Sequence, residues 1–169
     1  QMAKKGYTKD SVWVPSVTQI LKHVSADPEK LNEFYGDLGT KAAKAISKEA
    51  TGIGKWIHHV IEKKKVVTQE KAPSQEAWNC YLAFQDWKNT TRPVFVHHEL
   101  KIISIILEYG GTIDLIEDPD NLTITDFKSS KAIKPEHKLQ LGGYSLLAKE
   151  QGYEIRRLRI VRLDKSLGI

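Results

Sequence analysis

The segment Gly111-Thr-Ile-Asp-Leu-Ile-Glu-Asp-Pro-Asp-Asn-Leu-Thr-Ile-Thr-Asp-Phe-Lys128 decides the fold. Both of its ends are short and rich in β-branched residues, as strands are, and residues Glu117–Asn121 between them have turn chemistry. The segment therefore predicts two strands, Thr112–Ile116 and Leu122–Lys128, joined as a hairpin. We interpret the acidic residues Glu117, Asp118 and Asp120 as a solvated turn, because their spacing lacks the pattern of a calcium-binding loop.

Three ionisable residues of this hairpin are expected to converge. Side chains alternate along a strand, so Asp126 and Lys128 share one face, and counting back from the turn sets Asp114 roughly opposite Asp126. Two carboxylates can hold Mg²⁺ or Mn²⁺, and a neighbouring ammonium can position a water molecule or stabilise a charged transition state. Taken alone, the Asp-x-Lys pattern is more typical of a surface hairpin that carries a salt bridge.

Helical segments are predicted before the hairpin. Pro15–Leu21 reads as an extended segment that leads into a short helix with Ser16 as its N-cap. A polar helical stretch is expected from about Asp27 to Ala50, with interruptions near Gly36 and Gly39 and a break at Thr51–Gly54. A helix from Lys55 to about Lys65, with Ile57, Val60 and Ile61 on one side, and an aromatic-rich helix from Ser74 to about Lys88 are expected to follow.

The rest of the chain predicts the frame of a sheet. Strands are expected at Val94–Leu100, Ile102–Leu107 and Ile155–Leu163, and a helix at Pro135–Gln151. A helix between two strands indicates that the last strand runs parallel to its neighbour. We therefore expect an α/β fold with a central mixed β-sheet flanked by helices, formed by one domain over residues 1–169, with an N-terminal helical part at 1–53 and a core at 54–169. Gly142 and Gly143 inside the later helix favour either close packing on the sheet or close approach of DNA.

Composition narrows the class of protein. The chain of 169 residues has a net charge of +5 and a pI of about 9.2, which favours a polyanionic partner such as nucleic acid. Cys80 is the only cysteine, which excludes a disulfide framework and a cysteine-ligated zinc or iron–sulfur site within this chain. The start QMAKKGYTKD lacks the apolar region of a signal peptide, and no apolar run reaches membrane-spanning length. We expect a cytoplasmic protein, in a bacterial or phage-infected cell, without a membrane partner.

Four motifs then occur in a fixed order. Taken singly, a histidine early in a helix is most often structural, and a Gln-x-x-x-Tyr pair is an ordinary helix face. In this order, however, they resemble the RecB-like exonuclease branch of the PD-(D/E)XK nuclease superfamily, whose motifs are G-x-x-x-H-x-x-x-E, G-x-(I/V)-D, (D/E)-x-K and Q-x-x-x-Y. The matching residues are Gly54/His58/Glu62, Gly111/Asp114, Asp126/Lys128 and Gln140/Tyr144.

The segment Pro15–Leu21 also resembles phage and mitochondrial genome-maintenance exonucleases of this branch, so the resemblance covers roughly Pro15 to Leu163. It implies a restriction-endonuclease-like core. It also implies that Asp114 and Asp126 are metal ligands, that the backbone carbonyl of Phe127 supplies a further oxygen, and that Lys128 is the catalytic lysine.

The resemblance implies roles for residues outside the hairpin as well. His58 matches an additional metal ligand, although the adjacent His59 could take that place, and Glu99 matches an upstream glutamate that can serve a second metal. Gln140 and Tyr144 match a helix motif that supports the site and touches DNA. We expect the positive surface beside the site to come from Lys131, Lys134, Arg157 and Arg159.

The expected function is Mg²⁺- or Mn²⁺-dependent hydrolysis of DNA, by an exonuclease of phage or recombination-repair type that prefers linear ends. A recombination partner protein or a homo-oligomer would be compatible with that role. Two alternatives stay open: a structure-specific endonuclease or resolvase, and a DNA-binding accessory protein whose nuclease site is inactive.

Overall fold

The chain divides into two compact units. The structure is a computed structural model, and it describes residues 6–24 and 40–166. The sheet unit consists of residues 6–24, 93–127 and 133–161, and the helical unit of residues 40–92, 128–132 and 162–166.

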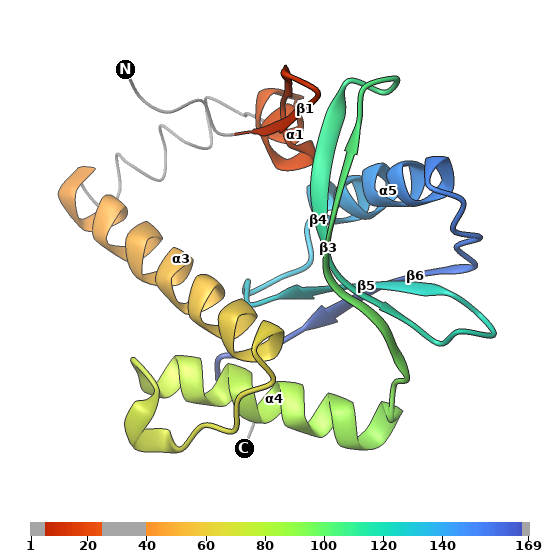
Figure 1. The fold of residues 1–169 in the computed structure, drawn as a ribbon. Helices are drawn as coiled ribbons and strands as arrows, with labels where there is room; N and C mark the ends of the chain where they lie inside the picture. The colour runs from red at the N-terminus through yellow and green to blue at the C-terminus, as the bar shows by residue number, and fades with distance from the viewer. Residues whose placement is uncertain (1–5, 25–39, 167–169) are drawn as a thin grey trace. The chain divides into compact units, whose positions relative to one another are not determined.

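Four strands form the main sheet, in the order β3-β4-β5-β6. Their bounds are Phe95–Ser104 for β3, Tyr109–Glu117 for β4, Thr123–Lys128 for β5 and Arg157–Arg162 for β6. Strand β4 runs antiparallel to both of its neighbours, β3 and β5 (Figure 1). Strand β6 runs parallel to β5, because the amide of Arg156 donates to the carbonyl of Leu122 and the amide of Leu163 donates to that of Lys128, both at 2.8 Å. The predicted α/β fold with a mixed sheet is confirmed.

Strand β3 corrects one prediction, since Val94–Leu100 and Ile102–Leu107 are not separate strands. Side chains alternate between the two faces of a strand, and Lys101 is exposed whereas the next residue, Ile102, is buried. Lys101 therefore fits within β3 and does not interrupt it. The chain turns instead at residues 105–108, three of which are apolar and give no turn signal. The hydroxyl of Ser104 accepts a 2.8 Å hydrogen bond from the amide of Leu107, and Glu108 takes a left-handed φ of 57°.

Two helices belong to the sheet unit: α1, Val17–Val24, and α5, Pro135–Glu150. Ser16 is the predicted N-cap of α1, and its hydroxyl accepts from the amide of Gln19 at 3.2 Å while the Gln19 side chain accepts from the Ser16 amide at 2.8 Å. The apolar side chains of α1 and α5 form one core with strands β3 to β5. The buried residues of this core are Val17, Ile102, Ile113, Ile116, Ile124, Leu141, Tyr144, Leu147 and Ala148.

Glycines allow close packing in this unit. A Cβ at Gly143 would lie 3.1 Å from a methyl carbon of Val17, so this glycine packs closely on α1, whereas a Cβ at Gly142 would meet no atom within 4 Å. The small hairpin of β1, Tyr7–Lys9, and β2, Val12–Val14, adjoins β4, where the amide of Gly110 donates to the carbonyl of Pro15 at 2.9 Å.

The helical unit contains α3, Thr40–Glu62, the 3-10 turn η1, Gln69–Lys71, and α4, Gln75–Thr91. The predicted break at Thr51–Gly54 is wrong, because α3 continues through it. Each glycine costs a helix roughly 1 kcal/mol relative to alanine, and burial of the neighbouring Ile53 and Ile57 offsets that cost. The predicted apolar side of this helix, formed by Ile57, Val60 and Ile61, is buried.

Helix α4 begins as predicted, with the Ser74 hydroxyl accepting from the amide of Ala77 at 3.2 Å, and it extends three residues beyond Lys88. The predicted helical residues 27–39, including the interruptions near Gly36 and Gly39, lie outside the described residues. Among the described helices, none is long and apolar enough to cross a membrane.

Candidate active site

Two carboxylates of neighbouring strands lie close together in the sheet unit. An oxygen of Glu99 on β3 lies within 4.8 Å of an oxygen of Asp114 on β4. Asp114 is buried and Glu99 is half-buried. Like charges at this separation repel, and partial burial strengthens the repulsion, so the pair favours a bound cation.

The backbone of β3 is distorted at this point. Glu99 has a left-handed φ of 45°, which is unusual for a non-glycine residue inside a strand. The residues on either side of it keep regular partners, His98 with Leu115 and Leu100 with Ile113. Such local strain is often retained where a side chain must be directed into a functional site. Here it accompanies the approach of Glu99 to Asp114.

Asp114 also reaches strand β5, because its Oδ2 accepts a 2.8 Å hydrogen bond from the backbone amide of Phe127. The β4–β5 register pairs Leu115 with Thr125, and carrying it one position further sets Asp114 opposite Asp126, as the count from the turn predicts. The side chain of Asp126 is almost completely buried. A shared cation between the two aspartates stays a prediction.

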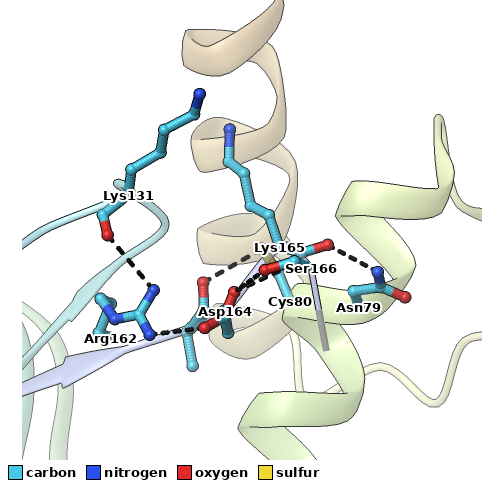
Figure 2. Close-up of polar contacts among 8 residues, drawn as sticks. Asn79, Cys80, Lys131, Arg162, Asp164, Lys165 and Ser166 are labelled. Atoms are coloured by element: carbon cyan, nitrogen blue, oxygen red, sulfur yellow. Dashed lines mark hydrogen bonds and ion pairs between the residues drawn. The ribbon is translucent and has the colours of Figure 1, made fainter. Parts of the chain in front are cut away.

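Lys128 ends β5, two residues after Asp126. The segment that follows it is anchored within the helical unit, where the Lys128 carbonyl accepts from the amide of Leu163 at 2.8 Å. Arg162 donates to the carbonyl of Lys131 at 3.4 Å and to the carboxylate of Asp164 at 2.5 Å. Figure 2 shows the Lys131 ammonium pointing away from these contacts, and the side chain is exposed. The segment after Lys128 therefore has a fixed backbone and an exposed cation.

Helix α5 supplies the Gln-x-x-x-Tyr pair to the sheet unit. The Gln140 amide donates a 2.7 Å hydrogen bond to the Tyr144 hydroxyl, and both side chains are buried. Burial raises the pKa of Tyr144 far above its ordinary value, and the charges of Asp114 and Asp126 raise it further. The hydroxyl of Tyr144 therefore keeps its proton at neutral pH.

Glu117 corrects the interpretation of a solvated acidic turn. It is the last residue of β4 and is fully buried, whereas Asp120 is exposed. Its Oε1 accepts hydrogen bonds from the Thr125 hydroxyl and from Arg159 Nη1, the latter at 2.6 Å. Burial nevertheless outweighs both partners, so the pKa of Glu117 is raised. Glu117 follows Leu115 by two residues, and residues two apart on a strand share a face. This spacing could have placed Glu117 on the strand with Leu115, but sequence reasoning missed it.

The arginines of β6 differ in environment. Arg157 is exposed, whereas Arg159 keeps 23% of its side chain accessible and forms the ion pair with Glu117. A DNA-contacting role stays a prediction for both. Lys134, predicted for the same surface, is exposed and lies 3.8 Å from the Glu136 carboxylate.

The two histidines of α3 also differ. His58 is half-buried, whereas His59 is exposed, with its Nδ1 3.9 Å from Glu62 and its Nε2 3.2 Å from the Lys65 ammonium. Glu62 also accepts from the ammonium of Lys63 at 2.7 Å. These contacts occupy the ring of His59 within the helical unit, so His58 stays the predicted ligand.

The donors of the sheet unit fit a hard divalent cation. Carboxylate oxygens of Glu99 and Asp114 are close enough to act together, and both are ligands that Mg²⁺ and Mn²⁺ prefer. The described residues contribute no thiolate, since Cys80 is buried in α4 and donates to the carbonyl of Leu163 at 3.5 Å. The donor chemistry is therefore consistent with a divalent-metal site.

Comparison with known proteins assigns a family to this arrangement. A model of the PD-(D/E)XK nuclease superfamily matches residues 29–166, which contain every residue predicted for the site. No curated protein matches the chain significantly. Membership implies a phosphodiesterase with a nucleic-acid substrate. The chain belongs to the PD-(D/E)XK nuclease superfamily.

Proposed function

We propose that this protein is a metal-dependent deoxyribonuclease that acts as an exonuclease on linear DNA. The observation that carries the proposal is the approach of Glu99 and Asp114 on adjacent strands, together with a hairpin register that brings Asp126 opposite Asp114. The carboxylates of Glu99 and Asp114 repel each other at this separation, and a bound cation would offset that repulsion.

Asp114 and Asp126 would hold Mg²⁺ or Mn²⁺, with the Phe127 carbonyl and His58 as further ligands and Glu99 serving the same or a second ion. When bound, the metal lowers the pKa of a coordinated water and neutralises negative charge on the scissile phosphate. The amide of Phe127 fixes one oxygen of Asp114, which orients this carboxylate before any substrate arrives.

Lys128 would hold the attacking water and stabilise the negative charge that develops on the phosphate, an interaction that strengthens in the transition state. Gln140 and Tyr144 would support the carboxylates from α5. The cations Lys131, Lys134, Arg157 and Arg159 would attract the DNA backbone, and the exposed members are best placed to do so.

The exonuclease assignment rests on the His58 motif and on the segment Pro15–Leu21, both of which resemble exonucleases of the RecB-like branch, of phage and recombination-repair type. A recombination protein or further copies of this chain would be compatible partners.

The test is incubation of the protein with end-labelled linear DNA, single- and double-stranded, and with covalently closed circles, in Mg²⁺, in Mn²⁺ and in EDTA. The proposal predicts degradation of linear DNA that requires the metal and leaves closed circles intact. Cleavage of closed circles would instead identify an endonuclease. Binding without cleavage in either metal would identify an inactive DNA-binding protein.

A further inference from the structure

Gly111 has no role that its sequence pattern explains, yet its position in the sheet unit is unusually confined. A Cβ at this residue would lie 2.5 Å from Cε1 and 2.9 Å from Cδ1 of Tyr144, which is closer than real side chains approach. The ring of Tyr144 therefore occupies the space that any side chain at position 111 would need. Glycine inside a strand often marks such a close approach.

Tyr144 has little freedom to move away from that clash. Its ring is buried in the core of the sheet unit, and a Cβ at Gly111 would also lie 3.5 Å from a methyl of Leu147 on the same helix. Protein cores are densely packed, so a displaced ring must shift its own hydroxyl. Any residue larger than glycine at 111 therefore changes the position of the Tyr144 hydroxyl.

The hydroxyl is held at a defined point. Gln140 donates to it at 2.7 Å, so the Tyr144 oxygen accepts this bond and keeps its own proton for donation. Gly111 and Asp114 both belong to β4, and α5, which carries Gln140 and Tyr144, packs against that strand. In the proposed site, this hydroxyl would be a donor that can stabilise carboxylate charge without competing for the metal.

We propose that Gly111 is a positioning residue for the candidate active site: the absence of a side chain there seats the Tyr144 ring against β4, so that Gln140 can fix the hydroxyl of this proposed supporting residue. This inference rests on the proposed nuclease function. It assigns the glycine a part in turnover, through Tyr144, in addition to its part in packing.

The experiment measures kcat and KM for cleavage of linear DNA, together with the melting temperature, in a double-mutant cycle of Gly111→Ala and Tyr144→Phe. Gly111→Ala alone is expected to lower kcat by roughly 100-fold, the size of effect that a small misplacement can have. In the Tyr144→Phe background it should lower kcat no further, because the hydroxyl is already gone. Gly111→Ala should lower the melting temperature in both backgrounds, because phenylalanine at position 144 keeps the ring that clashes.

Gly111→Ala/Tyr144→Leu is the second variant, and it keeps the test valid if Gly111→Ala does not fold. The smaller leucine relieves the clash, so the melting temperature should recover while kcat stays low. Gly52→Ala on α3 is the control, since an added Cβ there meets no atom within 4 Å; it should keep the parent kcat, and its melting temperature should not fall, because alanine favours a helix over glycine.

The possible outcomes separate this inference from the proposed nuclease function on which it rests. Loss of kcat by the same factor in both backgrounds, or recovery of kcat together with the melting temperature in Gly111→Ala/Tyr144→Leu, would show that Gly111 acts through packing alone and would overturn the inference while the nuclease function stands. Absence of cleavage by the parent protein would reject the proposed function and this inference with it.

Discussion

The backbone amide of Phe127 donates a 2.8 Å hydrogen bond to Oδ2 of Asp114, which connects the two strands of the candidate active site through a functional side chain. Asp114 therefore has a structural partner as well as a predicted metal. The two roles can be separated, because an amide oxygen can still accept from Phe127 but is a much weaker ligand for a hard cation.

Asp114→Asn and Asp114→Ala should both abolish cleavage, and only the second should destabilise the fold strongly. Alanine leaves the buried Phe127 amide without its acceptor, which costs about 1–3 kcal/mol, whereas asparagine keeps an acceptor oxygen. Urea unfolding alongside DNA cleavage measures both effects. Equal stability of the two variants would mean that the hydrogen bond contributes little.

Glu99→Gly should preserve or increase stability while lowering activity. Glycine relieves the left-handed φ of 45°, which costs other residues roughly 1 kcal/mol, but it removes the carboxylate beside Asp114. Glu108→Gly is the matched control, since Glu108 has a φ of 57° in an exposed turn, and it should gain stability without losing activity. Full activity in Glu99→Gly would exclude Glu99 from the site.

The buried pair of Glu117 and Arg159 predicts a particular dependence of stability on pH. Because the folded-state pKa of Glu117 is raised, the folded protein holds this proton more tightly, and the resulting stabilisation is present at acid pH and lost as the pH rises through the folded-state pKa. Glutamine at position 117 does not titrate. The free energy of unfolding of Glu117→Gln should therefore increase relative to that of the parent as the pH rises. A relative decline of Glu117→Gln with rising pH would contradict the raised pKa.

Arg157 and Arg159 should respond differently to truncation. Arg157→Ala removes an exposed cation, so it should weaken DNA binding and reduce the dependence of log affinity on log salt by about 1, with little effect on stability. Arg159→Ala leaves Glu117 buried without its cation, which should cost on the order of 3 kcal/mol. Fluorescence anisotropy across a salt series measures DNA binding by the two variants, and thermal unfolding measures their stability. A stability loss in Arg157→Ala but not in Arg159→Ala would contradict the roles assigned to the two arginines.

The hairpin of β4 and β5 could be predicted from the sequence because its signals are local. β-branched strands flank an Asp-Pro-Asp-Asn turn, and the register follows from the turn, which is why Asp114 was predicted opposite Asp126. The cap of α1 was equally local, since Ser16 and Gln19 bond reciprocally within one turn.

The features that sequence reasoning missed depend on contacts made elsewhere in the fold. Helix α3 passes through Gly52 and Gly54 because adjacent isoleucines are buried. The ion pair of Glu117 with Arg159 joins residues 42 positions apart, and no local pattern encodes it. The need for glycine at 111 becomes visible only when the ring of Tyr144 from α5 is in place.

The most direct test of the central claim is cleavage of linear DNA by Lys128→Ala, with Mn²⁺ binding to the same preparation measured by calorimetry. Lys128 is assigned to the transition state and not to the metal, so the rate should fall by roughly 100- to 1000-fold while Mn²⁺ affinity is retained or increased. Cleavage by Lys128→Ala at the parent rate would contradict the assignment of Lys128 and, with it, the proposed nuclease site.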